Sequence, residues 1–398
     1  MQIFENTEIA FRHRSYKELK KAAMLFRLMH YPGIMKISGA IARTFIRLNL
    51  PAKWLVNPII RHFCGGENLE ESASLVDFLS RFNVFSVLDY AAENRQSEAE
   101  IRSVIEEVIR TMDFAKRNPD VLFSVFKPSA LAPVEVLEKA NSFYSSDSTS
   151  ADGQAQGTEN FRNNIRVLCQ SAFERGIPVM IDAEESYYQD VVDGVAREMM
   201  ELYNREKAIV FNTIQMYRHD RLDFLHECIR HSRQNKYHLG LKIVRGAYMD
   251  QERLRAIKMG YPSPIYPDKK STDAAFDSAV SLSLQNIDST SIFAGTHNED
   301  SMLFLMEKMK EHGLKKNDQR IYVSQLYGMS DHISFNMAYD TYNVVKYIPY
   351  GPVNYLLPYL IRRAEENKSV AGQAGRELHY INLEIQRRNS IKKEKSWK

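Results

Sequence analysis

The 398-residue sequence predicts an α/β protein whose main body is a distorted (βα)8 barrel of the TIM type, preceded by an N-terminal helical region. Two observations predict this fold. Eight short apolar runs rich in β-branched residues recur along the chain, and a helix-like stretch follows each of them. The runs are apolar throughout rather than alternating, which is typical of parallel strands buried on both faces. Eight such units favour a closed barrel over an open sheet.

The strand candidates are spread evenly over the middle of the chain. They lie at 84–90, 121–129, 178–185, 209–217, 241–248, 291–298, 321–329 and 344–351. The stretches that follow, such as 97–117 and 301–313, carry apolar residues three and four positions apart, which indicates amphipathic helices. We therefore place the barrel at 84–367.

The segments around the barrel differ from it in composition. In the N-terminal region, 1–83, the stretch 19–66 contains eight Lys or Arg and no acidic residue, with apolar residues at helical spacing. This basic, amphipathic stretch is compatible with a helical subdomain packed on the main body, with a surface resting on an anionic membrane, where each basic side chain contributes about 1 kcal/mol, or with both together. Residues 142–159, rich in Ser, Asp, Gly and Gln, predict a mobile insertion. Residues 368–398 predict a helical, polar C-terminal tail.

Composition and missing motifs exclude several classes of protein. The chain has 53 Lys and Arg against 50 Asp and Glu, a balance that argues against a nucleic-acid partner. Its three cysteines are too widely spaced for a disulfide framework or a metal pair, so we expect no metal site. The sequence contains no GxGxxG, GxxxxGK[ST] or HExxH motif and no apolar run of 18 residues. With no secretory signal either, we expect a cytoplasmic protein.

Polar residues lie at the ends of seven of the eight strand candidates. For any one of them alone, a solvated loop residue or a helix cap is the favoured interpretation. Together they indicate a site, because the carboxyl ends of the strands of a parallel barrel meet at one mouth. In chain order they are Lys127; Asp182 and Glu184; Gln215; Lys242, Arg245 and Tyr248; Thr296, His297 and Asn298; Gln325 and Tyr327; and Tyr347.

The last helix-like stretch, 354–367, carries two adjacent arginines. Helical spacing places Tyr355, Tyr359, Arg362, Arg363 and Glu366 on one face, opposite a buried stripe formed by Leu356, Leu357, Leu360, Ile361 and Ala364. Adjacent guanidinium groups suit a carboxylate or phosphate ligand. The alternative, an exposed face with an Arg–Glu pair four residues apart, is equally compatible with this helix alone.

The residues at the strand ends and on the last helix belong to a series of sequence motifs. The motifs are VFKPSAL (125–131), IDAEE (181–185), NTIQMY (212–217), KIVRGAY (242–248), FAGTHN (293–298), QLYGM (325–329) and YIPYG with YLIRRAEEN (347–367). Together they resemble the proline dehydrogenase family, whose order of motifs they follow over roughly 84–367. The string RGAY, followed later by YLxRRxxEN, is the most specific part of the match.

The resemblance implies a role for each matching residue. Asp182 and Lys242 would belong to the catalytic centre. Proline would be bound by Lys127, Leu326, Tyr347, Tyr359, Arg362 and Arg363, with the arginines on its carboxylate and Glu93 closing over it. The flavin would lie against Ala183, Gln215, Lys242, Val244, Arg245, Gly246, Ala247 and Tyr248, with Thr296, His297 and Asn298 at its pyrophosphate and adenosine.

The resemblance also implies an activity. We expect FAD-dependent oxidation of L-proline to Δ1-pyrroline-5-carboxylate, the first step of proline catabolism to glutamate, by hydride transfer to flavin N5. Electrons would pass to a membrane quinone, with the protein peripheral on the inner membrane and a separate pyrroline-5-carboxylate dehydrogenase acting next. The alternatives are a hydroxyproline dehydrogenase, which the bulky Tyr347 disfavours, and a non-catalytic membrane-associated barrel. Lys242 replaces the arginine of many bacterial members and offers no bidentate contact.

Overall fold

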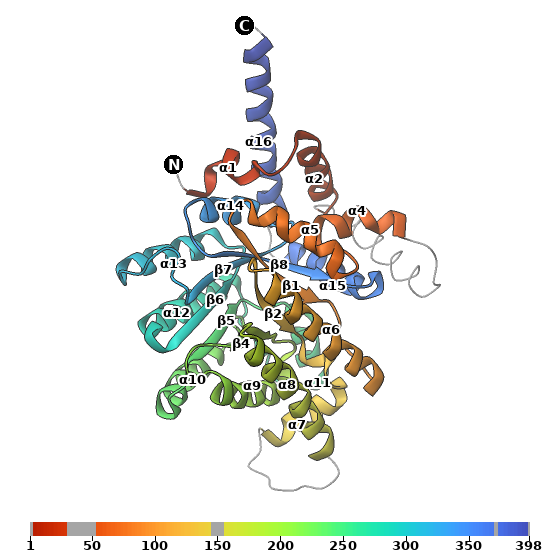
Figure 1. Ribbon diagram of the computed structural model, residues 1–398, viewed down its shortest axis with the longest axis vertical. Helices are drawn as coiled ribbons and strands as arrows, with labels where there is room; N and C mark the ends of the chain where they lie inside the picture. The colour runs from red at the N-terminus through yellow and green to blue at the C-terminus, as the bar shows by residue number, and fades with distance from the viewer. Residues whose placement is uncertain (1–2, 30–52, 145–154, 370–372, 397–398) are drawn as a thin grey trace. The chain divides into compact units, whose positions relative to one another are not determined.

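The computed structural model describes residues 3–29, 53–144, 155–369 and 373–396 (Figure 1). Eight strands pair in chain order, β1 to β8, into a closed barrel, which confirms the predicted fold. Each strand begins within two residues of its predicted start. The strands are β1 Val84–Tyr90, β2 Val121–Phe126, β3 Val179–Ile181, β4 Val210–Gln215, β5 Leu239–Val244, β6 Thr290–Gly295, β7 Ile321–Leu326 and β8 Val344–Tyr350.

Helices follow the strands as the sequence predicts. Short 3-10 turns lie at η1 Ile3–Glu5, η2 Pro128–Ala130, η3 Ser186–Tyr188 and η4 Ile287–Ser289. The α-helices of the N-terminal part are α1 Thr7–Phe11, α2 Tyr16–Met29, α4 Lys53–Phe63 and α5 Leu69–Ser80. Those that follow are α6 Glu98–Arg117, α7 Val134–Tyr144, α8 Ala155–Arg175, α9 Gln189–Tyr203, α10 Arg221–Asn235, α11 Met249–Met259, α12 Lys269–Gln285, α13 Glu299–Glu311, α14 Asp331–Tyr339, α15 Val353–Ser369 and α16 Gln373–Ser396.

The chain divides into two compact units, residues 86–324 and residues 1–85 with 325–398. Within residues 86–324, aromatic rings fill the space between the strands. The ring of Phe123 on β2 meets those of Phe211 on β4, Phe293 on β6 and Tyr322 on β7 edge to face, at centroid distances of 5.4, 5.2 and 5.0 Å. Because β2 is adjacent to neither β4, β6 nor β7 in the strand order, these rings meet across the interior.

The helix α6 shows how the sequence specifies the outer layer of this unit. Ser97 accepts a hydrogen bond from the Glu100 amide, and the Glu100 carboxylate accepts one from the Ser97 amide. This capping box starts the helix. The face of α6 that packs against β2 buries Ile101, Val104 and Val108.

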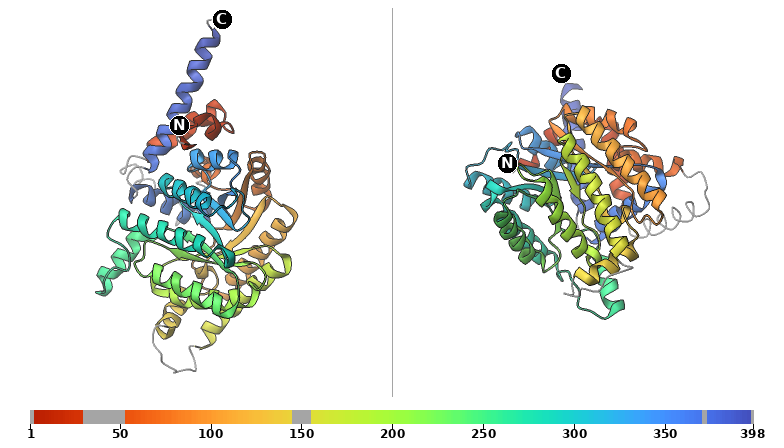
Figure 2. Two further views of the ribbon diagram at one scale, coloured as in Figure 1. Left: turned by 90° about the vertical axis from the view of Figure 1, so that its left-hand side faces the viewer. Right: turned by 60° about the horizontal axis from the view of Figure 1, so that its bottom comes forward.

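Within the other unit, the N-terminal helices α1 and α2 pack beside the long helix α16, as Figure 2 shows. The helix α2 buries Leu19, Ala22 and Phe26 and leaves its lysines toward solvent. The helices α2 and α4 lie in the described parts of the stretch 19–66, and residues 30–52 lie outside the described part. For α2, burial of the apolar face supports the packing interpretation.

A buried ionic cluster joins the segment after α1 to α14 and β8 within this unit. Asp331, at the start of α14, lies 2.8 Å from Arg14, 3.3 Å from His13 and 3.0 Å from Lys346 of β8. Burial favours the neutral form of Asp331, but the charges of Lys346 and Arg14 lower its pKa well below its ordinary value. The cluster therefore holds a buried carboxylate in its charged form.

Two expectations from the sequence need correction. The stretch 142–159 is partly helical, because residues 142–144 end α7 and residues 155–159 begin α8, while residues 145–154 lie outside the described part. In α15, Leu356, Leu357 and Leu360 are buried as predicted, but Tyr359 is buried with them and Ile361 is half-exposed.

No helix in the described ranges combines the length and hydrophobicity that a bilayer crossing needs.

Candidate functional site

Buried polar side chains gather where β1 to β5 end, within residues 86–324. Asp89 lies on β1, Lys127 directly follows β2, Asp182 and Glu184 follow β3, Gln215 ends β4 and Lys242 lies on β5; all six are at least nine-tenths buried. Burying so many polar groups costs free energy unless they pair with one another. The cluster they form is called the strand-end cluster below.

Lys127 is the centre of the first ion pair. Its Nζ donates a hydrogen bond to Asp89 Oδ2 at 2.6 Å and lies 3.9 Å from Glu93 Oε1. Burial alone would lower the pKa of Lys127, but the charges of Asp89, Glu93 and Asp182 raise it above its ordinary value. Burial also raises the pKa of Asp89, and Lys127 opposes this effect. Lys127 therefore carries its positive charge inside the barrel.

The second ion pair joins Lys242 to Asp182. Lys242 Nζ donates to Asp182 Oδ1 at 2.5 Å, although the residues are 60 positions apart and β4 separates their strands. Side chains of two non-adjacent strands meet only across the barrel, so this pair spans its interior at the strand ends. Because Asp182 also raises the pKa of Lys127, the two pairs form one electrostatic group.

Glu184 completes the cluster through a neutral partner. Its carboxylate accepts one hydrogen bond from the Ser129 amide at 2.8 Å and another from Ser129 Oγ at 2.7 Å. Burial and the nearby charge of Glu93 raise the pKa of Glu184 to about 7, against the effect of the two hydrogen bonds. Glu184 thus joins the ends of β3 and β2.

The segment after β5 has the properties that a cofactor-binding turn needs. Residues 244–248 are half-exposed, whereas most of β5 is buried. Gly246 has φ +132°, and a Cβ at this position would come within 2.5 Å of the Tyr217 ring, so both backbone and space require glycine. This turn is therefore fixed against Tyr217 while its other side stays open.

Arg245 connects this turn to the end of β6. Its guanidinium donates to Asp273 Oδ1 and Ser301 Oγ, each at 2.8 Å, and also to Thr296 Oγ1. Asn298 accepts a hydrogen bond from the Ser301 amide at 3.3 Å and so caps α13. Burial lowers the pKa of Arg245.

Gln215 offers a buried acceptor to a ligand, as a bound cofactor such as a flavin would require. The Oε1 atom of Gln215 is buried and has no hydrogen-bond partner within the described ranges. A buried amide oxygen without a partner costs free energy, so a ligand that donates a hydrogen bond here would remove that cost. The amide nitrogen of the same residue makes a 3.5 Å contact with the Ala183 carbonyl oxygen. No group of three or more metal-ligating side chains occurs in these ranges.

The remaining predicted substrate residues belong to the other unit. Tyr347 on β8 and Tyr359 on α15 are buried, and Leu326 at the end of β7 is half-exposed. Arg362 and Arg363 lie within α15, but their side chains are outside the described part. Within residues 86–324 the structure thus brings together Glu93, Lys127, Asp182 and Lys242, and separately Thr296 with Arg245 and Asn298.

Asp89, Ser129 and Glu184 are members of this site that sequence reasoning left without a role. Asp89 carried a signal, because a carboxylate inside the apolar run VFSVLDY needs a buried partner. Ser129 and Glu184, although within the matching motifs, are 55 positions apart, and nothing in the sequence indicates their contact.

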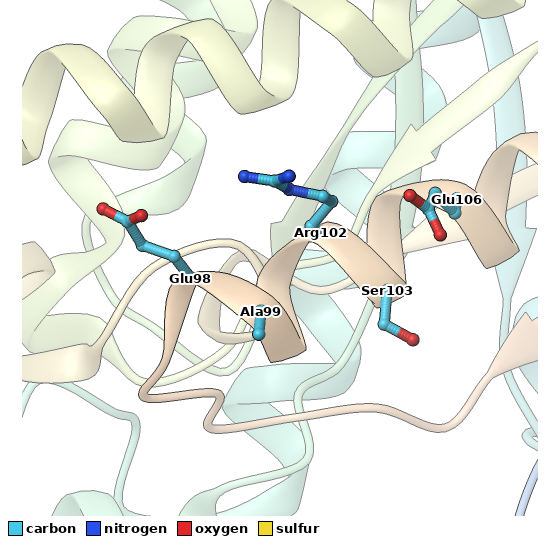
Figure 3. Close-up of a pocket in the computed structure, with 5 residues that line it drawn as sticks. All are labelled: Glu98, Ala99, Arg102, Ser103 and Glu106. Atoms are coloured by element: carbon cyan, nitrogen blue, oxygen red, sulfur yellow. The ribbon is translucent and has the colours of Figure 1, made fainter.

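A surface hollow of about 450 Å³ beside α6 (Figure 3) is lined by Glu98, Ala99, Arg102, Ser103 and Glu106, all of them exposed and none part of the strand-end cluster.

Comparison with solved structures supports the fold. PutA from Bdellovibrio bacteriovorus inactivated by N-propargylglycine superposes with a TM-score of 0.71 over 93% of this chain, at 19% sequence identity. PutA from Bradyrhizobium japonicum, as the variant D778Y, gives a TM-score of 0.67 over 85% of this chain, at 20% identity. This chain spans only 37% and 34% of those two PutA chains.

Comparison of sequences gives the family. The family model described as proline dehydrogenase matches residues 76–376. The carbapenem antibiotics biosynthesis protein CarD of Pectobacterium carotovorum subsp. carotovorum is 32% identical over 94% of each chain. Proline dehydrogenase 1, mitochondrial, of Dictyostelium discoideum is 30% identical over 96% of this chain and 74% of its own length. The chain belongs to the proline dehydrogenase family of oxidoreductases.

Proposed function

We propose that this protein is an FAD-dependent proline dehydrogenase that oxidises L-proline to Δ1-pyrroline-5-carboxylate. The observation that carries the proposal is the strand-end cluster, in which two buried lysines lie paired with carboxylates in a barrel of this family. A zwitterionic amino acid needs both signs of charge in its binding site, and the cluster supplies both.

The flavin would be held by the open turn after β5 and by the end of β6. Gln215, Lys242, Ala183 and the turn Val244–Tyr248 would contact its ring system, and Thr296, His297 and Asn298 its pyrophosphate and adenosine. Bound flavin would supply the acceptor for the hydride that leaves proline. Two features support this placement: Gln215 Oε1 has no hydrogen-bond partner among the described residues, and position 246 requires glycine.

The residues of the chain would bind and orient the substrate. Lys127, charged because its acidic neighbours raise its pKa, would attract the proline carboxylate together with Arg362 and Arg363. Tyr347, Tyr359 and Leu326 would contact the proline ring and exclude water. Orientation of this kind supplies roughly 7–11 kcal/mol of a reaction barrier. Asp182, paired with Lys242 at 2.5 Å, would keep that cation in place.

The proposed reaction also needs an electron acceptor and an enzyme that consumes its product. Electrons would go to a membrane quinone, with the basic stretch 19–66 at an anionic membrane surface and a separate pyrroline-5-carboxylate dehydrogenase consuming the product.

Product analysis tests the proposed reaction. The flavin-loaded protein is incubated with L-proline and an artificial electron acceptor, and the cyclic imine is trapped with o-aminobenzaldehyde. We expect the coloured adduct to form with L-proline and much more slowly with trans-4-hydroxy-L-proline, because the buried Tyr347 would crowd a ring hydroxyl. Faster turnover of hydroxyproline would favour the hydroxyproline dehydrogenase, and turnover of neither would favour a non-catalytic barrel.

The arginine pair can be tested in the same assay. Arg363→Met should raise the KM for L-proline by about 100-fold or more, since a charge-assisted bidentate contact contributes about 3 kcal/mol, while the flavin content stays normal. The matched control is Arg110→Met on the exposed side of α6, which should change neither quantity. An unchanged KM in Arg363→Met would contradict the carboxylate assignment.

A further inference from the structure

The short turn after β1 that carries Glu93 is held in place by Ser129. The Asn94 amide donates to Ser129 Oγ at 3.1 Å, and the Arg95 amide donates to the Ser129 carbonyl oxygen at 2.9 Å. Asn94 adopts a left-handed φ of +55°, and Arg95 Nε donates to the Glu93 carbonyl oxygen at 2.8 Å. Ser129 thus fixes both amides that follow Glu93.

Ser129 is itself oriented by Glu184. Ser129 Oγ donates its hydrogen bond to Glu184 Oε1, so its lone pairs can accept a hydrogen bond from the Asn94 amide. The second carboxylate oxygen of Glu184 accepts from the Ser129 amide. Since Ser129 is fully buried and Glu184 is 3% exposed, water cannot easily replace either bond.

Glu93 needs such an anchor because its neighbours repel it. Its charge raises the pKa of both Asp89 and Glu184, so three carboxylates lie close together. Lys127 attracts Glu93, with its Nζ 3.9 Å away and bonded to Asp89. The fixed backbone after Glu93 holds its side chain beside Lys127 in spite of this repulsion.

We propose that Glu184 and Ser129 are positioning residues that hold Glu93 at the Lys127 side of the substrate site. The expected effect on proline kinetics rests on the proposed function, since Glu93 would contact bound proline. The effect on the backbone after Glu93 does not depend on that function. Neither Glu184 nor Ser129 needs to touch the substrate. Their whole effect on proline binding should therefore pass through the Glu93 side chain.

A double-mutant cycle tests this dependence. Ser129→Ala removes the hydroxyl that accepts from the Asn94 amide and donates to Glu184, but keeps the backbone. Because the Asn94 amide then has lost its buried hydrogen bond to Oγ, the KM for L-proline should rise by about 5- to 10-fold with little change in kcat. In a Glu93→Ala background the same substitution should change KM less than 2-fold. Equal increases in both backgrounds, or no increase in either, would overturn the proposal. Ser103→Ala on exposed α6 is the matched control.

Hydrogen exchange separates this proposal from the proposed function. In the flavin-loaded wild type, the Asn94 and Arg95 amides should be protected. Ser129→Ala should speed exchange of Asn94 by about tenfold, and Glu184→Gln should speed both amides, with no change in peptides from β4 and β5. Unaltered exchange in Ser129→Ala would refute the anchor even if proline is oxidised. Faster exchange would support it even if the wild type does not oxidise proline.

Discussion

The buried Lys127–Asp89 pair makes a quantitative prediction about stability. Lys127→Met removes the cation, 8% exposed, from a carboxylate that is 1% exposed at 2.6 Å. At an effective dielectric constant of 20, two unit charges at this distance attract by roughly 6 kcal/mol. Loss of hydration offsets part of this attraction. Removing one partner of a buried pair therefore costs about 3–5 kcal/mol of unfolding free energy.

The pH dependence of this loss provides a second test. Burial already raises the pKa of Asp89, and without Lys127 the pKa rises further. A carboxyl whose folded pKa lies above its unfolded value is stabilising while protonated, so stability falls as pH rises from the unfolded pKa toward the folded one. We expect Lys127→Met to lose more stability at pH 8 than at pH 5.

Urea denaturation followed by circular dichroism measures both effects. The double variant Lys127→Met with Asp89→Asn should recover much of the loss, since it removes the unpaired charge. The control Lys308→Met breaks an exposed pair with Glu311 at 2.7 Å and should cost less than about 1 kcal/mol. A loss below about 1 kcal/mol for Lys127→Met at pH 8, or a double variant as unstable as the single one, would refute the reasoning.

Three further predictions concern other parts of the chain. Asp331→Asn leaves buried cations unpaired beside α14 and should lower the unfolding free energy by about 3–5 kcal/mol in urea denaturation; an unchanged midpoint would contradict this. Gly246→Ala forces a Cβ against the Tyr217 ring and should reduce flavin content by absorbance, whereas Gly313→Ala, with open space around it, should not. Burial and Glu93 raise the pKa of Glu184 to about 7, so its contribution to stability is complete below pH 4.5 and should be lost as pH rises through 7. This loss is about 3 kcal/mol at most. The variant Glu184→Gln should show a flatter fall of stability with pH, and an equally steep fall would contradict the assignment.

The sequence predicted the strands well because each is a continuous apolar run that ends abruptly in polar residues. It predicted Lys127, Asp182 and Lys242 for the same reason, since a charge at the end of such a run has a known place in a barrel. It did not predict which charges pair, because Lys242 and Asp182 meet across the interior, 60 residues apart. Pairing of this kind depends on closure of the whole sheet.

Two errors have different physical causes. On α15 the predicted buried stripe does not include Ile361, which is half-exposed, whereas Tyr359 on the other face is buried. A tyrosine ring is apolar enough to be buried while its hydroxyl remains polar, so helical spacing does not decide between the two. The insertion at 142–159 was drawn too long, since polar composition alone hides the helical turns at both of its ends. The sequence placed Glu184 at a strand end but did not predict its contact with Ser129, because Ser129 resembles an ordinary residue after a strand.

Anaerobic titration of the flavin-loaded protein with L-proline tests the central claim most directly. In the absence of oxygen and of any other acceptor, the visible absorbance of the flavin should be bleached by L-proline, reaching completion when the substrate is in excess. D-proline and glycine should leave the spectrum unchanged at the same concentrations. A spectrum that stays oxidised with L-proline, or that is bleached only by another amine, would contradict the account.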